Sequence, residues 1–86
     1  LRDMMGMLRK GEFMKVRQWV ANNSDLDGNV TFRAIYDSLY EYMTPPSIPE
    51  AVVILAKYGY QAAFAADKEI NLMGCLTELM ARTKWK

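Results

Sequence analysis

Residues 32–46 read FRAIYDSLYEYMTPP, and this stretch decides the fold. Its large apolar side chains recur every three or four positions, at Phe32, Ile35, Leu39, Tyr42 and Met43. That spacing is typical of one face of an α-helix and differs from the alternation of a β-strand. Thr44-Pro45-Pro46 then ends the helix, because proline cannot continue it. The stretch therefore predicts an amphipathic helix with a defined end.

Two further helices are predicted on the N-terminal side. The first has an apolar stripe at Leu1, Met4, Met5 and Leu8, and the second has one at Phe13, Val16, Trp19 and Val20. Gly11 separates them, as glycine commonly does just past the end of a helix. The polar run 22–28 has the composition of a loop.

Two more helices are predicted on the C-terminal side. Ser47 and Glu50 have the spacing of a capping box, and Pro49 lies in the first turn of a helix that should run through Val52, Val53, Leu55 and Ala56 toward Phe64. Asp67 should cap the fifth helix. The fifth apolar stripe comprises Leu72, Met73, Leu76, Leu79 and Met80. We therefore expect one all-α domain over residues 1–86, a five-helix bundle.

Composition argues against catalysis. The 86 residues include no histidine, which removes the commonest general base and metal ligand. The single cysteine, Cys75, excludes an internal disulfide and is expected to be a small buried hydrophobe. No phosphate-binding glycine loop is present. We expect no enzyme activity, cofactor or metal in this chain.

The apolar runs also argue against a membrane span. The longest, residues 51–56, is far too short to cross a bilayer. No signal peptide is visible, so we expect a cytoplasmic protein.

One loop keeps an ion-binding alternative open. Asn23, Asp25, Asp27 and Gly28 match the first half of an EF-hand calcium loop. The bidentate glutamate of that loop should stand at position twelve, where this chain has Ala34. An Asx-rich turn that caps the third helix is the simpler interpretation.

A second alternative is nucleic-acid binding. Arg9, Lys10, Lys15 and Arg17 form a basic cluster over the first two helices. Acidic residues lie among these charges, which favours an ordinary solvated surface, and the net charge of the chain is only +1. A small nucleic-acid-binding helical domain stays open as a hypothesis.

Aromatic residues suggest a protein interface. The chain has more large amphipathic side chains than a core of this size needs, and such residues are enriched where proteins meet. The candidate interface residues are Tyr36, Tyr40, Tyr58, Tyr60 and Trp85.

The order of these helices resembles the C-terminal collar domain of clamp-loader small subunits, the replication factor C-like AAA+ family, and bacteriophage members above all. The likeness spans the whole chain. It is carried by Lys10-Gly11, by Arg33-Ala34-Ile35-Tyr36, by Met43-Thr44-Pro45, and by Ala65-Ala66-Asp67-Lys68-Glu69 followed by Trp85-Lys86. The Pro45-Pro46 pair departs from the family pattern.

The resemblance implies a function in assembly. Collars of such loaders pack side by side and organise the ATPase modules that open a sliding clamp on DNA during replication. The chain would then be the C-terminal part of a longer AAA+ protein in a phage-infected bacterial cell. Its partners would be other loader subunits, identical and different. ATP, magnesium, the sliding clamp and primer-template DNA would be contacted only by the rest of the protein.

Overall fold

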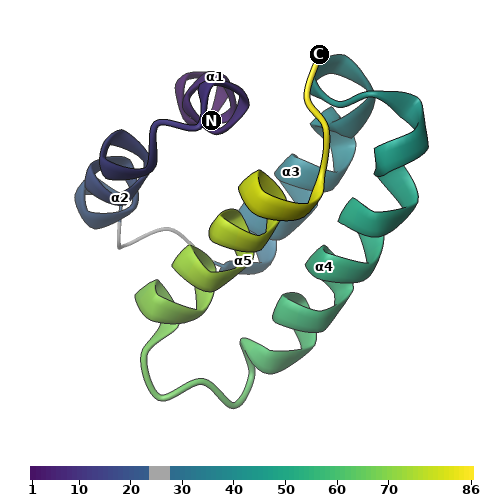
Figure 1. The fold of residues 1–86 in the computed structure, drawn as a ribbon. Helices are drawn as coiled ribbons and strands as arrows, with labels where there is room; N and C mark the ends of the chain where they lie inside the picture. Colours follow the sequence, from purple (N-terminus) through teal and green to yellow (C-terminus); the bar gives the residue numbers. More distant parts are fainter. Residues whose placement is uncertain (24–27) are drawn as a thin grey trace.

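The computed structural model describes residues 1–23 and 28–86, and the described chain is all-α (Figure 1). Its helices are α1 (Arg2–Lys10), α2 (Phe13–Asn22), α3 (Gly28–Tyr42), α4 (Ile48–Gln61) and α5 (Lys68–Arg82), with a short 3-10 turn, η1 (Pro45–Ser47), before α4. The described residues form no strand, only one isolated antiparallel bridge between Met43 and Trp85. The all-α prediction is confirmed.

Helices α3, α4 and α5 form one group, and the hairpin of α1 and α2 lies beside it. α4 packs against α3 and α5, and α2 packs against α5. α1 and α2 lie together on one side of the molecule, and α4 forms the opposite edge (Figure 1). The face of α4 that points away from α3 and α5 is therefore left uncovered.

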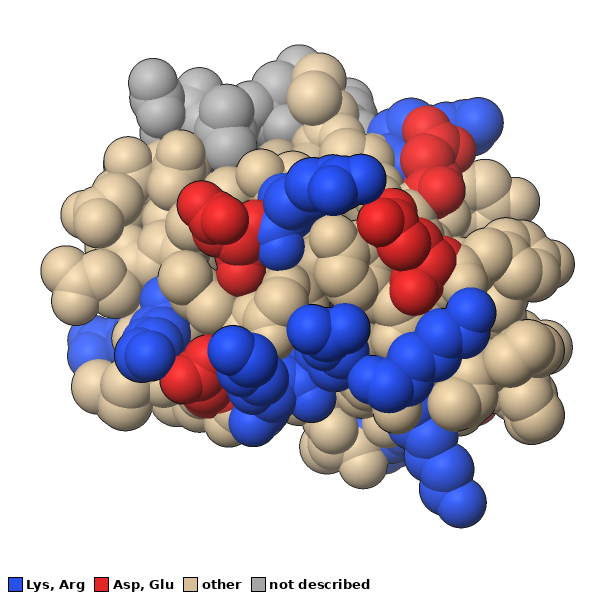
Figure 2. Space-filling model, turned by 90° about the horizontal axis from the view of Figure 1, so that it is seen from above, with Lys and Arg blue, Asp and Glu red and all other residues tan. Residues whose placement is uncertain are grey.

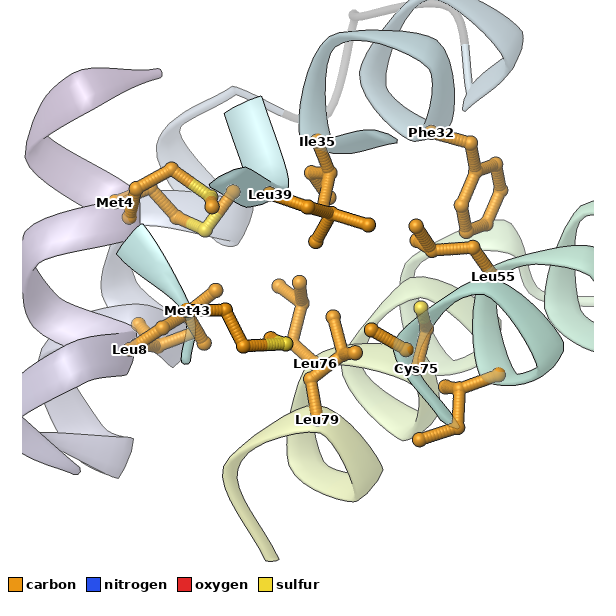
Figure 3. Packing of buried hydrophobic residues seen from close by; sticks show 14 of the residues in the cluster. Met4, Leu8, Phe32, Ile35, Leu39, Met43, Leu55, Cys75, Leu76 and Leu79 are labelled. Atoms are coloured by element: carbon orange, nitrogen blue, oxygen red, sulfur yellow. The ribbon is translucent and has the colours of Figure 1, made fainter. Parts of the chain in front are cut away.

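All five helices contribute to one hydrophobic core (Figure 3). Its members are Met4, Met5, Leu8, Val16, Val20, Phe32, Ile35, Leu39, Met43, Ile48, Ala51, Ile54, Leu55, Cys75, Leu76 and Leu79. The stripe predicted on α3 is buried, apart from the half-buried Tyr42. Cys75 is a buried free thiol, as expected. Burial raises the pKa of this thiol to about 12, with a smaller effect from the Glu78 charge.

Two predicted helix ends are confirmed. Gly11 has φ 69°, a left-handed conformation that costs glycine little, and its amide donates to the Leu8 carbonyl at 3.0 Å. The Asp67 carboxylate accepts a hydrogen bond from the Ile70 amide at 3.0 Å. Both ends depend on chemistry within a few residues, which is why sequence alone predicts them.

The predicted capping box at the start of α4 is wrong. The Ser47 side chain makes no cap hydrogen bond to the helix, and its Oγ instead accepts from the Lys84 amide at 2.9 Å. Pro49 does lie in the first turn, as predicted. The end of α4 is also corrected, because the helix stops at Gln61 rather than continuing toward Phe64.

Several apolar residues of the predicted helices lie at the surface. In α4 the core-facing residues are Ile48, Ala51, Ile54 and Leu55, whereas Val52, Val53 and Ala56 are exposed. The unbroken apolar run 51–56 gives no indication of which side faces inward, so its inward face could not be read from periodicity. Leu1 and Phe13 are also exposed, contrary to the stripes predicted for them.

Candidate subunit interface

The uncovered side of α4 is apolar. Val53, Tyr60 and Phe64 are 63%, 72% and 73% exposed, and with Val52 and Ala56 they form what we term the α4 outer face. Residues 52, 56 and 60 recur every four positions and therefore share one side of the helix. Phe64 follows the helix end, and its ring lies 5.3 Å from that of Tyr60. Because the opposite side of α4 is buried in the core, this helix is apolar on two sides.

A groove between α3 and α4 continues this surface. It is lined by Tyr36, Asp37, Leu39, Tyr40, Ile48 and Val52. Tyr36 and Tyr40 are 47% and 73% exposed, so both rings reach solvent at the edge of the groove. Val52 belongs to both surfaces. The structure thus brings Tyr36 and Tyr40, two of the predicted interface residues, to one groove, and Val52 connects that groove to the α4 outer face, which carries Tyr60.

The Tyr36 ring contacts Arg33, which is itself paired with Asp37. The Arg33 guanidinium carbon lies 5.2 Å from the Tyr36 ring centroid, within range of a cation–π contact. Arg33 also pairs with Asp37 one turn later, at 3.2 Å. These contacts position the ring beside the groove without covering it.

Tyr58, by contrast, is occupied inside the fold. It is half-buried, and its hydroxyl donates to Glu78 Oε1 at 2.7 Å. This hydrogen bond to a carboxylate raises the pKa of Tyr58 to about 12. Its ring also lies close to α5, where a Cβ added at Gly74 would come within 3.0 Å of Tyr58 Cε1. Tyr58 therefore serves to join α4 to α5.

Glu78 is the centre of that junction. Its Oε1 also accepts from Lys57 Nζ at 2.7 Å, and its Oε2 lies 3.7 Å from Arg82 Nε. The hydrogen bonds from Lys57 and then Tyr58 lower the pKa of Glu78. Three side chains thus contact one carboxylate: Lys57 and Tyr58 come from α4, and Arg82 comes from α5. This cluster fixes α5 against the inner side of α4.

Trp85 is also held within the chain. It is half-buried, and its Nε1 donates to the Leu79 carbonyl at 3.3 Å. The backbone on either side of it pairs with the α3–α4 connection: Thr44 donates to the Lys84 carbonyl at 3.0 Å, and Lys86 donates to the Tyr42 carbonyl at 2.9 Å. We term residues 83–86 the C-terminal tail. This pairing joins positions about 40 residues apart, so no local sequence pattern could reveal it.

A second apolar surface lies on the other side of the molecule. A groove between α1 and α2 is lined by Met7, Met14, Lys15, Gln18, Trp19 and Asn22. Met14 is 66% exposed. The helices that carry this groove lie opposite α4 (Figure 1). The chain therefore presents two different apolar surfaces that face in different directions.

The described residues give little support to the other kinds of site that the sequence suggests. The half EF-hand loop depends on Asp25 and Asp27, which lie outside the part of the chain that the structure describes. Within residues 1–23 and 28–86, no group of three histidine, cysteine, aspartate or glutamate side chains is placed to hold a metal ion. None of the described helices combines the length and apolarity needed to cross a membrane.

Comparison with known proteins assigns no family. The chain matches no protein-family model, and no curated protein matches its sequence significantly.

Proposed function

We propose that this chain is a non-catalytic assembly domain that packs against neighbouring protein subunits through the α4 outer face. The observation that carries the proposal is the two-sided apolar character of α4, with Val53 and Tyr60 on one side and Ile54 and Leu55 on the other. A helix that is apolar all round is typically buried. In this chain only one of its sides is covered.

The area of exposed aromatic surface favours a partner protein. Tyr40, Tyr60 and Phe64 are each about three-quarters exposed. Covering these three rings would remove on the order of 400 Å² from water, since a buried aromatic side chain shields about 150–250 Å². At about 25 cal/mol per Å² this corresponds to about 10 kcal/mol before the entropic cost of association. Exposed apolar patches of a few hundred Å² are often functional, which supports a binding role for the rings of the α4 outer face and the adjoining groove.

The second apolar surface, on α1 and α2, supports a head-to-tail arrangement. Rings and other heterologous assemblies need two different surfaces on each subunit, so that each copy meets one neighbour on each side. The groove at Met7, Met14 and Trp19 and the α4 outer face meet that requirement, because they lie on opposite sides of the molecule.

The specific assembly we propose is a DNA sliding-clamp loader, in which this chain is the collar of a small subunit. The support is the sequence resemblance to that family. Two of the segments that carry the resemblance, Met43-Thr44-Pro45 and Trp85-Lys86, lie side by side: Met43 and Trp85 face each other in an isolated bridge, whose hydrogen bonds run from Thr44 to Lys84 and from Lys86 to Tyr42. On this proposal the ATPase module lies upstream, the loader acts in the cytoplasm, and this chain organises its neighbours without chemistry of its own.

The mass of the assembled protein tests the interface. The protein expressed from its complete coding sequence should form a defined oligomer by light scattering after size exclusion. Val53→Lys/Tyr60→Lys should reduce it to monomers, because two charges would have to be buried. Ile70→Lys/Thr77→Lys adds the same charge to exposed positions on α5 and should leave the mass unchanged. An unchanged mass for the α4 variant would reject the proposed interface.

The clamp-loader assignment has a separate test. The complete coding sequence should contain a Walker-type phosphate loop within the few hundred codons before Leu1, and the purified protein should hydrolyse ATP faster in the presence of primer-template DNA. If an oligomer forms but neither feature is present, the assembly role stands and the clamp-loader assignment is wrong.

A further inference from the structure

The basic residues of this chain gather at the end of the molecule that carries α1 and the C-terminal tail. Figure 2, seen from above, shows Lys and Arg side chains in a row along one edge of this end, with fewer acidic side chains among them. α1 and the chain terminus both lie at this end (Figure 1). Arg9 and Lys10 occupy the last turn of α1, and Lys84 and Lys86 belong to the tail. We term these four residues the basic ridge.

Ion pairs compensate two of the other cations nearby. Arg2 pairs with Glu41 at 3.3 Å, and Lys15 pairs with Glu12 at 2.9 Å. Among the described residues, no ion pair neutralises a member of the basic ridge. Of the basic cluster that the sequence suggests, Arg9 and Lys10 belong to the ridge, Lys15 is compensated by Glu12, and Arg17 lies on α2. Two lysines from the far end of the chain join Arg9 and Lys10.

The tail is fixed in place by its backbone. The Lys84 amide donates to Ser47 Oγ and its carbonyl accepts from the Thr44 amide, at 2.9 and 3.0 Å. Lys86 Nζ donates to the Tyr40 carbonyl at 2.8 Å and keeps two further donor hydrogens. These bonds hold residues more than 70 positions away in the sequence on the same end of the molecule as α1, so the ridge is a product of the fold.

The basic ridge has no apolar centre, and this indicates the kind of partner that it binds. Protein interfaces usually have an apolar centre with a polar rim. The large exposed apolar side chains here lie mainly on α2, α3 and α4 and after α4, whereas the ridge residues are charged and exposed. Contacts to a nucleic-acid backbone need only cations that reach phosphates and release counterions. We infer that the basic ridge binds the phosphate backbone of a nucleic acid, single-stranded or duplex, without reading its sequence.

This inference goes beyond the proposed assembly role and is independent of it. The ridge shares no residue with the α4 outer face, so a ridge variant should keep the oligomeric mass of the wild type. It differs from the expectation, implied by the family resemblance, that DNA is contacted only by the rest of the protein.

Fluorescence anisotropy with a labelled 20-nucleotide single strand tests the inference. Four phosphate contacts predict a slope of about −3 in log affinity against log salt, or about a 60-fold loss between 50 and 200 mM salt. Arg9→Gln/Lys84→Gln removes one cation from each segment and should reduce the slope to about −1.5, an eightfold loss over the same range. Lys68→Gln, matched against Lys84→Gln alone, removes one cation from the far end of α5 and should behave as wild type.

Three results would overturn the inference. One is the absence of binding at 25 mM salt with 200 µM protein. Another is an equal loss of affinity in the ridge and control variants, which would indicate an effect of net charge alone. The third is displacement of the strand by an acidic polypeptide of equal charge as readily as by unlabelled DNA, which would make the ridge a site for acidic proteins.

Discussion

Val53 and Ile54 are neighbours in α4 that face opposite ways, and this makes them a sharp test of the fold. Ile54 is 2% exposed and Val53 is 63% exposed. Ile54→Ala deletes three buried carbons, which costs about 2.4 kcal/mol at about 0.8 kcal/mol each. The cavity left behind brings the total to about 3 kcal/mol. Val53→Ala removes two carbons, and only about a third of their surface is shielded from water. The lost burial costs about 0.5 kcal/mol, and the better helix propensity of alanine offsets it.

Urea unfolding of the 86-residue chain, followed by circular dichroism, measures both changes. With a slope of about 1 kcal/mol per molar urea, Ile54→Ala should lower the midpoint by about 3 M and Val53→Ala should leave it within about 0.5 M of wild type. If Ile54→Ala is too unstable to measure, Ile54→Val should still cost about 1 kcal/mol. Equal shifts for the alanine variants, or a larger one for Val53, would refute the placement of α4 on which the interface depends.

Three further predictions concern single side chains. Because contact with Lys57 lowers the pKa of Glu78, this carboxylate contributes stability above its unfolded pKa near 4.5 that is lost as pH falls through the folded value. Glu78→Gln should therefore destabilise at pH 7 and by progressively less as the pH falls below 4.5 in thermal melts, and an equal loss at every pH would contradict this. The Cys75 thiol should resist Ellman's reagent at pH 8 until the chain unfolds. With a pKa of about 12, only ~1 in 10⁴ molecules carries the reactive thiolate at that pH. Rapid reaction of the folded chain would show that the thiol is accessible. Ser47→Ala should speed hydrogen exchange at the Lys84 amide and cost about 0.5–1 kcal/mol, whereas faster exchange in the first turn of α4 alone would restore the capping-box interpretation.

Sequence alone predicted the features that depend on nearby residues. Gly11 and Asp67 mark helix ends through chemistry within one turn, and the spacing of Phe32, Ile35 and Leu39 identifies the buried side of α3. The recurrence of apolar residues every three or four positions made the prediction for α3 possible.

The remaining features depend on tertiary contacts. The run 51–56 is apolar throughout, so only packing against α3 and α5 decides that Ile54 faces inward and Val53 outward. On the proposed function, the continuous apolarity of this run reflects a helix that neighbouring subunits cover on its outer side. Ser47 resembled a helix cap until the tail, 37 residues later, supplied a different donor. Tyr58 was as plausible an interface residue as Tyr60, because only the position of Glu78 distinguishes them.

The most direct test of the account is the accessibility of the α4 outer face in the complete protein. A Val53→Cys variant would place a reactive thiol on that face, while Cys75 stays buried and serves as an unreactive internal reference. Maleimide labelling at residue 53, followed by mass spectrometry, should be rapid in the isolated 86-residue chain. In the oligomer formed by the protein from its complete coding sequence, it should be at least tenfold slower. Equal labelling rates in the two would mean that no subunit covers α4, and would contradict the central claim.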